Sequence, residues 1–138
     1  MDKHIARKRF EQALKDHEPQ FEKFFLSRFF DLSISYGDET CVVEADVEDY
    51  MFNPQGSLHG GVIAFMMDVS MGHLCQKFLG TCVTLEMKTQ FLKGVKEGTV
   101  KCEARFLKKG KTLVYVESRL FDDAGRLAAV STATWYRL

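Results

Sequence analysis

The sequence predicts an α+β fold in which a curved antiparallel sheet of about six strands wraps around one long central helix. One apolar segment, from about Gly60 to Leu79, is long enough for a helix of about 30 Å, roughly the width of a small domain. Two stretches before it and four after it alternate apolar with polar side chains, as half-buried strands do. A sheet curved around the helix would bury both, and nothing in this order favours a parallel nucleotide-binding sheet.

The length and composition of the chain limit its class. Of its 138 residues 46% are apolar, so we expect a single domain over residues 1–138. Lys and Arg together number 19, as do Asp and Glu, and this balance argues against a nucleic-acid partner. The first residues mix both charge signs, and no apolar run is long and charge-free enough to span a membrane. We therefore expect a cytoplasmic protein without a membrane partner.

The amino-terminal part, residues 1–28, is expected to be an extra helical segment. Apolar side chains recur at helical spacing between about residues 3 and 17. Pro19 then breaks the pattern, and a second short helical piece follows through Phe21, Phe24 and Phe25. We expect this piece to lie over the core.

The strands are predicted from alternation and from turn-forming residues. A hairpin is expected, with alternation from Phe30 to Tyr36, a turn at Gly37 and Asp38, and a second strand from Cys41 to Val47. After the central helix the expected strands are 82–92, 99–108, 112–122 and 126–137. The four cysteines are widely and irregularly spaced, so we expect buried reduced thiols and no metal site.

The central helix has two distinct apolar faces. One forms a core stripe that the sheet should contact, made of Ile63, Met67, Met71, Leu74 and Phe78. The other is made mostly of small residues around a lone carboxylate: Gly61, Ala64, Phe65, Asp68, Gly72 and Cys75. Two interpretations stay open. The face either packs closely against another backbone or a second subunit, with Asp68 satisfied by an Arg or a backbone amide, or forms a ligand slot in which Asp68 reacts.

The segment before Asp68 reads NPQGSLHGGVIAFMMD and places two glycines where the helix begins. Glycine there leaves backbone N–H groups accessible to a close-approaching oxygen. With the helix dipole, such donors suit a carbonyl oxygen that becomes negative during a reaction. The alternative explanation of Gly60 and Gly61 is tight packing alone.

These residues resemble the signature of the hotdog-fold acyl-CoA thioesterases, of the PaaI-like, thioesterase-superfamily and 4-hydroxybenzoyl-CoA-related type. The signature is carried by Asn53, Gly56, Leu58, His59, Gly60, Gly61 and Asp68. The similarity extends from the first hairpin to the end of the chain and includes the turn at residues 107–113.

The resemblance implies roles for the matching positions. Gly60 would polarise the thioester carbonyl through its backbone N–H, and Asp68 would act as nucleophile or as general base toward water. Asn53 and His59 would hold the thioester and the water. Thr84 would orient the attacking water, and Gly61 would contact the substrate. The turn formed by Lys108, Lys109, Gly110 and Lys111 would approach the phosphates of coenzyme A. No cofactor is implied beyond the coenzyme A of the substrate. The sites would be shared across a homodimer, and two dimers would form a homotetramer.

One carboxylate and one oxyanion site are chemically sufficient to hydrolyse a thioester. A thiol has a pKa of about 8.5 and can leave as thiolate without a dedicated general acid. No Ser/His/Asp set or GxSxG motif is present. The acyl group stays open between an aromatic one, such as arylacetyl or hydroxyaryl, and a medium-chain aliphatic one.

Two alternatives remain. One is a non-catalytic acyl-CoA binding or sensing domain that uses the same groove. The other is a hotdog enoyl-thioester hydratase or dehydratase, which would need a cooperating Asp and His. Asp68 and His73 diverge by about 140° on a helix, which makes that cooperation difficult.

Overall fold

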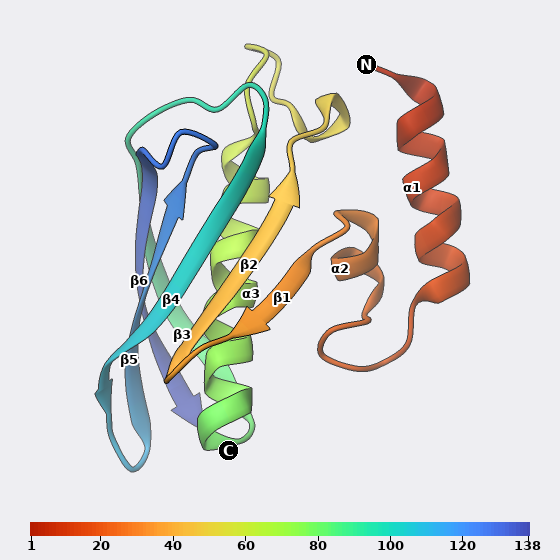
Figure 1. The fold of residues 1–138 in the computed structure, drawn as a ribbon. Coiled ribbons are helices and arrows are strands. Elements are labelled where there is room, and N and C mark those ends of the chain that lie inside the picture. Colours follow the sequence, from red (N-terminus) through yellow and green to blue (C-terminus); the bar gives the residue numbers. More distant parts are fainter.

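The computed structural model describes all of residues 1–138, and its helices and strands follow the predicted order (Figure 1). The elements are α1 (Lys3–Asp16), α2 (Phe25–Phe29), β1 (Ser33–Tyr36), β2 (Thr40–Asp46), a short 3₁₀ turn (Asp49–Met51), α3 (Gly60–Leu79), β3 (Cys82–Phe91), β4 (Thr99–Lys109), β5 (Leu113–Phe121) and β6 (Leu127–Arg137). The central helix and the four strands after it therefore lie where the hydrophobic patterns predict them.

The first strand is shorter than predicted. Phe30 and Leu32 were expected in it, but β1 begins only at Ser33. The N–H groups of Phe30 and Asp31 still donate into the end of α2, and Asp31 adopts a φ of 52° that turns the chain out of the helix. Leu32 is only 2% exposed. The alternation at Phe30 and Leu32 therefore reflects burial beneath the helical turn and not strand geometry.

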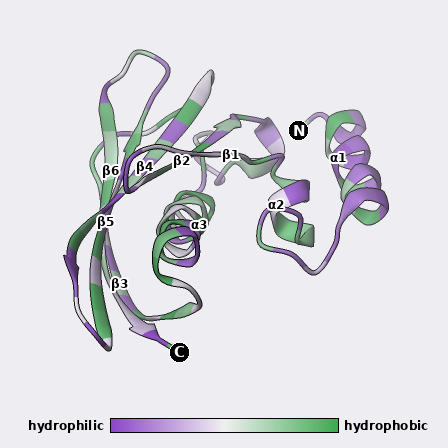
Figure 2. Cartoon of the chain, turned by 60° about the horizontal axis from the view of Figure 1, so that its bottom comes forward, coloured by the Kyte–Doolittle hydropathy of each residue, from purple (hydrophilic) through white to green (hydrophobic).

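The six strands form one antiparallel sheet in the order β1-β2-β4-β5-β6-β3. Seen nearly along α3, the sheet curves around the helix, while α1 and α2 lie beyond the open side of the curve (Figure 2). Although β3 follows α3 directly in the chain, it pairs only with β6 and so forms an edge of the sheet. This is the predicted hotdog arrangement.

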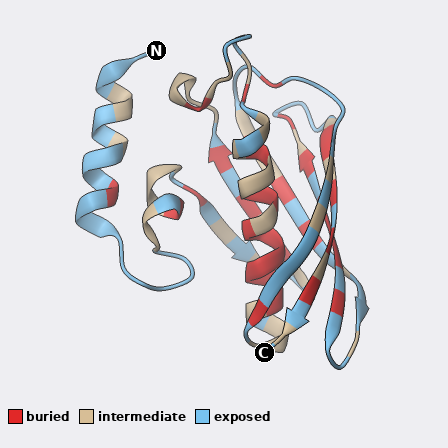
Figure 3. Cartoon of the chain, turned by 180° about the vertical axis from the view of Figure 1, so that it is seen from behind, coloured by how far each residue is buried: buried red, intermediate tan, exposed pale blue.

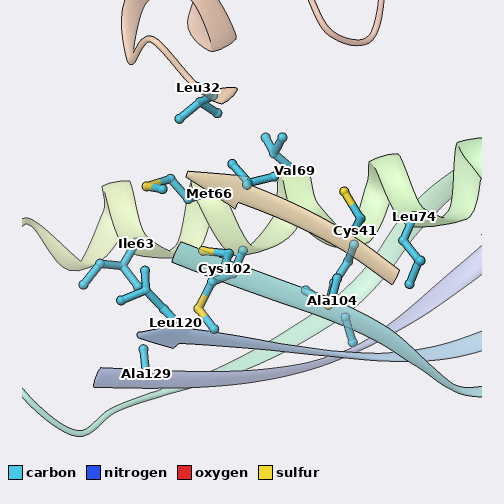
Figure 4. Packing of buried hydrophobic residues seen from close by; sticks show 14 of the residues in the cluster. Leu32, Cys41, Ile63, Met66, Val69, Leu74, Cys102, Ala104, Leu120 and Ala129 are labelled. Atoms are coloured by element: carbon cyan, nitrogen blue, oxygen red, sulfur yellow. The ribbon is translucent and has the colours of Figure 1, made fainter. Parts of the chain in front are cut away.

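The main core lies between α3 and the concave face of the sheet. Figure 4 shows the side chains of Ile63 and Leu74 directed from α3 toward the strands. The predicted stripe is confirmed: its first four members are buried, and Phe78 packs at the margin against Phe106 at 6.4 Å between ring centroids. All four cysteines are free and buried, as predicted. Burial raises the pKa of the Cys41 and Cys75 thiols to about 12, so both stay protonated at neutral pH.

The helix α1 stands apart from the core. Most of its residues are exposed, and only Ala13 is fully buried (Figure 3). It packs on α2 through Phe10, which meets Phe25 edge to face, and Arg9 forms an ion pair with Asp31 at 2.8 Å. None of the helices combines the length and apolar character that crossing a membrane requires.

Candidate active site

A groove of about 500 Å³ opens beside the small-residue face of α3. Residues from four parts of the chain line it: the segment before α2, the middle of α3, the start of β3 and the end of β6. They are Pro19, Gln20, Phe21, Phe24, Asp68, Val69, Gly72, His73, Cys82, Val83, Thr84 and Trp135. The register of the sheet explains part of this assembly, because Thr84 of β3 pairs directly with Trp135 of β6.

Asp68 is the one acidic side chain in this groove. Its Oδ1 accepts a hydrogen bond of 2.9 Å from the Thr84 hydroxyl, and no Lys, Arg or His forms an ion pair with it. Burial raises the pKa of Asp68, and the Thr84 hydrogen bond lowers it in part. A carboxylate that is desolvated and not neutralised by a cation is more basic than one in water, which suits a base or nucleophile.

The small-residue face has different surroundings at Gly72 and at Asp68. At Gly72 close packing holds, because a Cβ there would lie 3.0 Å from Cη2 of Trp135. At Asp68 the carboxylate is bonded to neither an Arg nor a backbone amide of its own chain, and it lines the groove.

The start of α3 carries a free backbone donor. His59 is the N-cap, and its Nδ1 accepts a hydrogen bond of 2.8 Å from the Gly61 N–H. Gly61 thus uses its N–H within the cap, whereas the Gly60 N–H has no acceptor in the chain. A donor at a helix amino terminus, aligned with the dipole, is suited to an oxygen that gains negative charge.

Asn53 shapes the loop that leads to Gly60. Its side-chain oxygen accepts from the Ser57 N–H at 3.1 Å, and its amide nitrogen donates to the Ser57 hydroxyl at 3.1 Å. The loop is held further by the His59 N–H, which donates to the Met51 carbonyl at 2.9 Å. Asn53 therefore fixes the local turn, and it lies outside the groove around Asp68.

The predicted site residues fall into three groups in one chain. Asp68 and Thr84 meet in the groove, as expected. Asn53, His59, Gly60 and Gly61 gather at the start of α3, about two turns or about 12 Å along the helix axis from Asp68. The third group is the β4–β5 hairpin of Lys108, Lys109, Gly110 and Lys111, where the Gly110 carbonyl accepts from Arg137 at 3.1 Å and Lys109 pairs with Glu39. A single chain does not bring the three together.

A hollow of about 610 Å³ elsewhere in the molecule is structural in character. It lies between the loop at 93–98 and the turn at 122–126. Asp122 accepts there from Lys93 Nζ at 2.5 Å and from the backbone N–H of Arg126 at 2.9 Å. These bonds lower the pKa of Asp122 to about 2. A carboxylate so firmly paired is a poor base, so this ion pair serves to hold the two loops together.

Sequence reasoning missed several residues of the groove, namely Phe21, Phe24, His73 and Trp135. Trp135 lies two residues after the inward-facing Ala133 in β6 and so points to the same face, which the sequence pattern indicates, but its position in the groove with Asp68 depends on the sheet register. His73 is buried, and its ring nitrogens lie 2.9 Å from the Val69 carbonyl and 2.8 Å from the Phe21 carbonyl. It is therefore not directed at Asp68, so Asp68 and His73 do not form the Asp–His pair that a hydratase would need.

The chain is similar to proteins of known family. The family model described as Thioesterase superfamily matches residues 55–129. The chain is 30% identical over 100 residues to acyl-coenzyme A thioesterase 13 of Mus musculus, which covers 70% of this chain and 71% of that protein. It is 29% identical over 110 residues to 1,4-dihydroxy-2-naphthoyl-CoA hydrolase of Escherichia coli, covering 77% and 81%. The structure of the E. coli PaaI protein has a TM-score of 0.81 at 18% identity, over 97% of this chain and 96% of that one, a likeness in fold.

Proposed function

The chain belongs to the thioesterase superfamily and is a thioester hydrolase; from this we propose that it cleaves an acyl-coenzyme A thioester into a free acid and coenzyme A, with Asp68 as the reactive group. The observation that carries the proposal is the Asp68 carboxylate in its groove. It is desolvated, bonded only to Thr84, and close to no cation that would neutralise it.

Asp68 acts in one of two ways. As a general base it takes a proton from a water molecule, whose oxygen adds to the thioester carbon. As a nucleophile its own oxygen adds, and water then cleaves the resulting anhydride. In both cases the carbon–sulfur bond breaks and the electron pair leaves with sulfur as a thiolate, which needs no separate acid because its pKa is about 8.5. Thr84 holds the carboxylate in place and, beside it, orients the attacking water.

The Gly60 N–H is the proposed donor to the carbonyl oxygen, with Asn53 and His59 holding the thioester end and the water. In one chain Gly60 and Asp68 are about 12 Å apart along α3, too far for one carbonyl group to reach both. We therefore propose that each site combines Gly60 of one subunit with Asp68 of the other. A two-fold axis reverses the partner's α3, so that one helix start can lie beside the middle of the other helix.

The edge strand β3 supports such a homodimer. Its backbone pairs on one side only, and it exposes large apolar side chains: Val83 is 42% exposed, Leu85 56% and Phe91 54%. A long apolar edge of this kind is covered in stable proteins, and a second β3 would cover it. A second apolar area on the outer face of the sheet, around Leu113, Tyr115 and Tyr136, would pair two dimers into a homotetramer.

Coenzyme A and the acyl group are proposed to occupy different surroundings. The exposed lysines of the β4–β5 hairpin offer positive charge to the phosphates, while the apolar groove beside Asp68 takes the acyl group. The aromatic side chains of Phe21, Phe24 and Trp135 favour an aromatic acyl group over a medium-chain aliphatic one. The E. coli relative bears the name of a naphthoyl-CoA hydrolase, which supports the same choice.

Release of free thiol from a panel of aromatic and aliphatic acyl-coenzyme A esters tests this function. We expect turnover by the wild-type protein and a fall in kcat of at least about 10²-fold for Asp68→Asn. The variant should remain folded, with a Tm no lower than that of the wild type, because burial raises the pKa of Asp68 and so disfavours its ionised form in the folded state. Turnover by Asp68→Asn within a few fold of wild type would overturn the assignment. Binding of the esters without any hydrolysis would instead indicate the binding-only alternative.

A further inference from the structure

Residues 19–24, which we call the strap, form one side of the groove beside Asp68. Pro19, Gln20, Phe21 and Phe24 line it from the strap, opposite Val83 and Thr84 of β3. The strap is a compact turn, because the Glu18 N–H donates to the Lys23 carbonyl at 2.8 Å. The groove is therefore enclosed on this side by a segment that belongs to neither the sheet nor α3.

The strap is tied to α3 by a small number of contacts. The His73 ring is 2% exposed and lies between two carbonyls, with Nε2 at 2.8 Å from the Phe21 oxygen and Nδ1 at 2.9 Å from the Val69 oxygen. The same ring meets Phe21 edge to face at 5.1 Å between centroids. Phe24 meets Phe65 of α3 edge to face at 6.2 Å. Each strap phenylalanine thus has its own contact on α3.

We propose that the strap is the outer wall of the acyl pocket and sets the size of acyl group accepted, and that His73 is the residue that positions it. The inference rests on the proposed function, since Asp68 marks where the thioester carbon must lie. From that point the chain beyond the carbonyl runs along the apolar surface between Trp135 and the strap phenylalanines. The charged nucleotide end of coenzyme A has no cationic side chain in this groove, so the acyl end is the part that fits it.

Truncation of the wall should change selectivity between acyl groups. With Phe24→Ala we expect the ratio of kcat/KM for decanoyl- or naphthoyl-coenzyme A to that for butyryl-coenzyme A to rise by about tenfold, because a removed ring leaves room for the bulkier group. Phe10→Ala is the matched control, because Phe10 lies in the same amino-terminal part but outside the groove. An unchanged or lower ratio in Phe24→Ala would overturn the proposal.

The role of His73 is tested by a pair of variants. His73→Phe keeps an aromatic ring but removes the ring nitrogens that face the Val69 and Phe21 carbonyls. We expect the selectivity ratio to rise as in Phe24→Ala, with KM for butyryl-coenzyme A changed more than kcat. His73→Gln keeps a donor and should restore most of the wild-type ratio. If both variants show the same ratio as wild type, His73 does not position the wall.

A binding measurement separates this inference from the proposed function. Trp135 is the only tryptophan and lines the groove, so its fluorescence reports occupancy without catalysis. Decanoate and naphthoate should change the fluorescence of the wild-type protein, with affinities that shift in Phe24→Ala but not in Phe10→Ala. If the acids bind in this way but no thioester is hydrolysed, the proposed function is wrong and the proposed acyl pocket stands. If thioesters are hydrolysed but Phe24→Ala changes neither affinity nor selectivity, the proposed acyl pocket is wrong and the proposed function stands.

Discussion

At Asp68 two opposing influences act on one carboxyl group. Burial raises its pKa, and the hydrogen bond from Thr84 lowers it in part. Reaction requires the ionised carboxylate, so kcat/KM should fall as the pH drops through this raised pKa. Thr84 therefore widens the pH range over which Asp68 is usable, in addition to holding the carboxylate in one orientation.

Thr84→Val removes the hydroxyl while keeping the shape of the side chain. Without the hydrogen bond the pKa of Asp68 rises further, so we expect the acidic limb of the kcat/KM profile to move to higher pH. Thr84→Ser keeps the donor and should leave the limb near its wild-type position. Profiles of thioester hydrolysis between about pH 4 and 8 would show the difference, since unperturbed Asp titrates near 3.9. Coincident limbs for Thr84→Val and wild type would show that Asp68 does not control this titration.

At the scale of the element, a substitution at the start of α3 can remove the backbone N–H of Gly60 alone. Proline is tolerated at the first position of a helix, where the backbone N–H has no helical partner. His59 already has the extended backbone, with φ −62° and ψ 135°, that a following proline requires. Gly60→Pro thus deletes the proposed carbonyl donor with little other change. Gly60→Ala is its control, because it brings a Cβ to about the same place, 3.3 Å from the exposed Phe91 ring, and keeps the N–H.

The expected outcome is a large difference between these two variants. Loss of one oxyanion donor typically lowers kcat by about 10²–10³-fold, so Gly60→Pro should fall by that factor and Gly60→Ala by much less. Circular dichroism and Tm would establish that α3 persists in both. Equal activities for the proline and alanine variants would exclude the Gly60 N–H as the donor.

How far the sequence predicts each element depends on the range of the interactions that form it. Helical periodicity placed Asp68 on a face distinct from the core stripe, and alternation placed the strands after α3, because both patterns arise from local geometry. The sequence did not predict that the strap forms a wall of the groove beside Asp68. Its placement depends on the contact of Phe21 with His73, 52 residues away, and no local pattern encodes such a pairing. Phe30 was misassigned for a related reason, since burial without regular structure imitates alternation.

At the scale of the whole molecule, two features of the single chain are incomplete, and pairing with a second copy would complete both. Strand β3 exposes an unpaired apolar edge, and the Gly60 donor is separated from Asp68 within its own chain. Both features lie along the same side of the protein, because the Phe91 ring at the end of β3 lies 3.3 Å from where a Cβ on Gly60 would stand, while Thr84 near the start of β3 donates to Asp68. An antiparallel pairing of two β3 strands would therefore bring the start of each α3 toward the Asp68 region of the other.

Subunit complementation distinguishes shared sites from sites within one chain. Asp68→Asn and Gly60→Pro are each expected to be nearly inactive alone. If every site takes Asp68 from one subunit and Gly60 from the other, a mixed dimer has one site with both groups intact and one site with neither. Random mixing of equal amounts should then restore about a quarter of wild-type activity, since half of the dimers are mixed and each has one of two sites working. If both groups act within one chain, every site in every dimer carries one defect, and co-refolded mixtures stay as inactive as the parents. Mixing either variant with itself controls for refolding, and size-exclusion chromatography with light scattering establishes that dimers have formed.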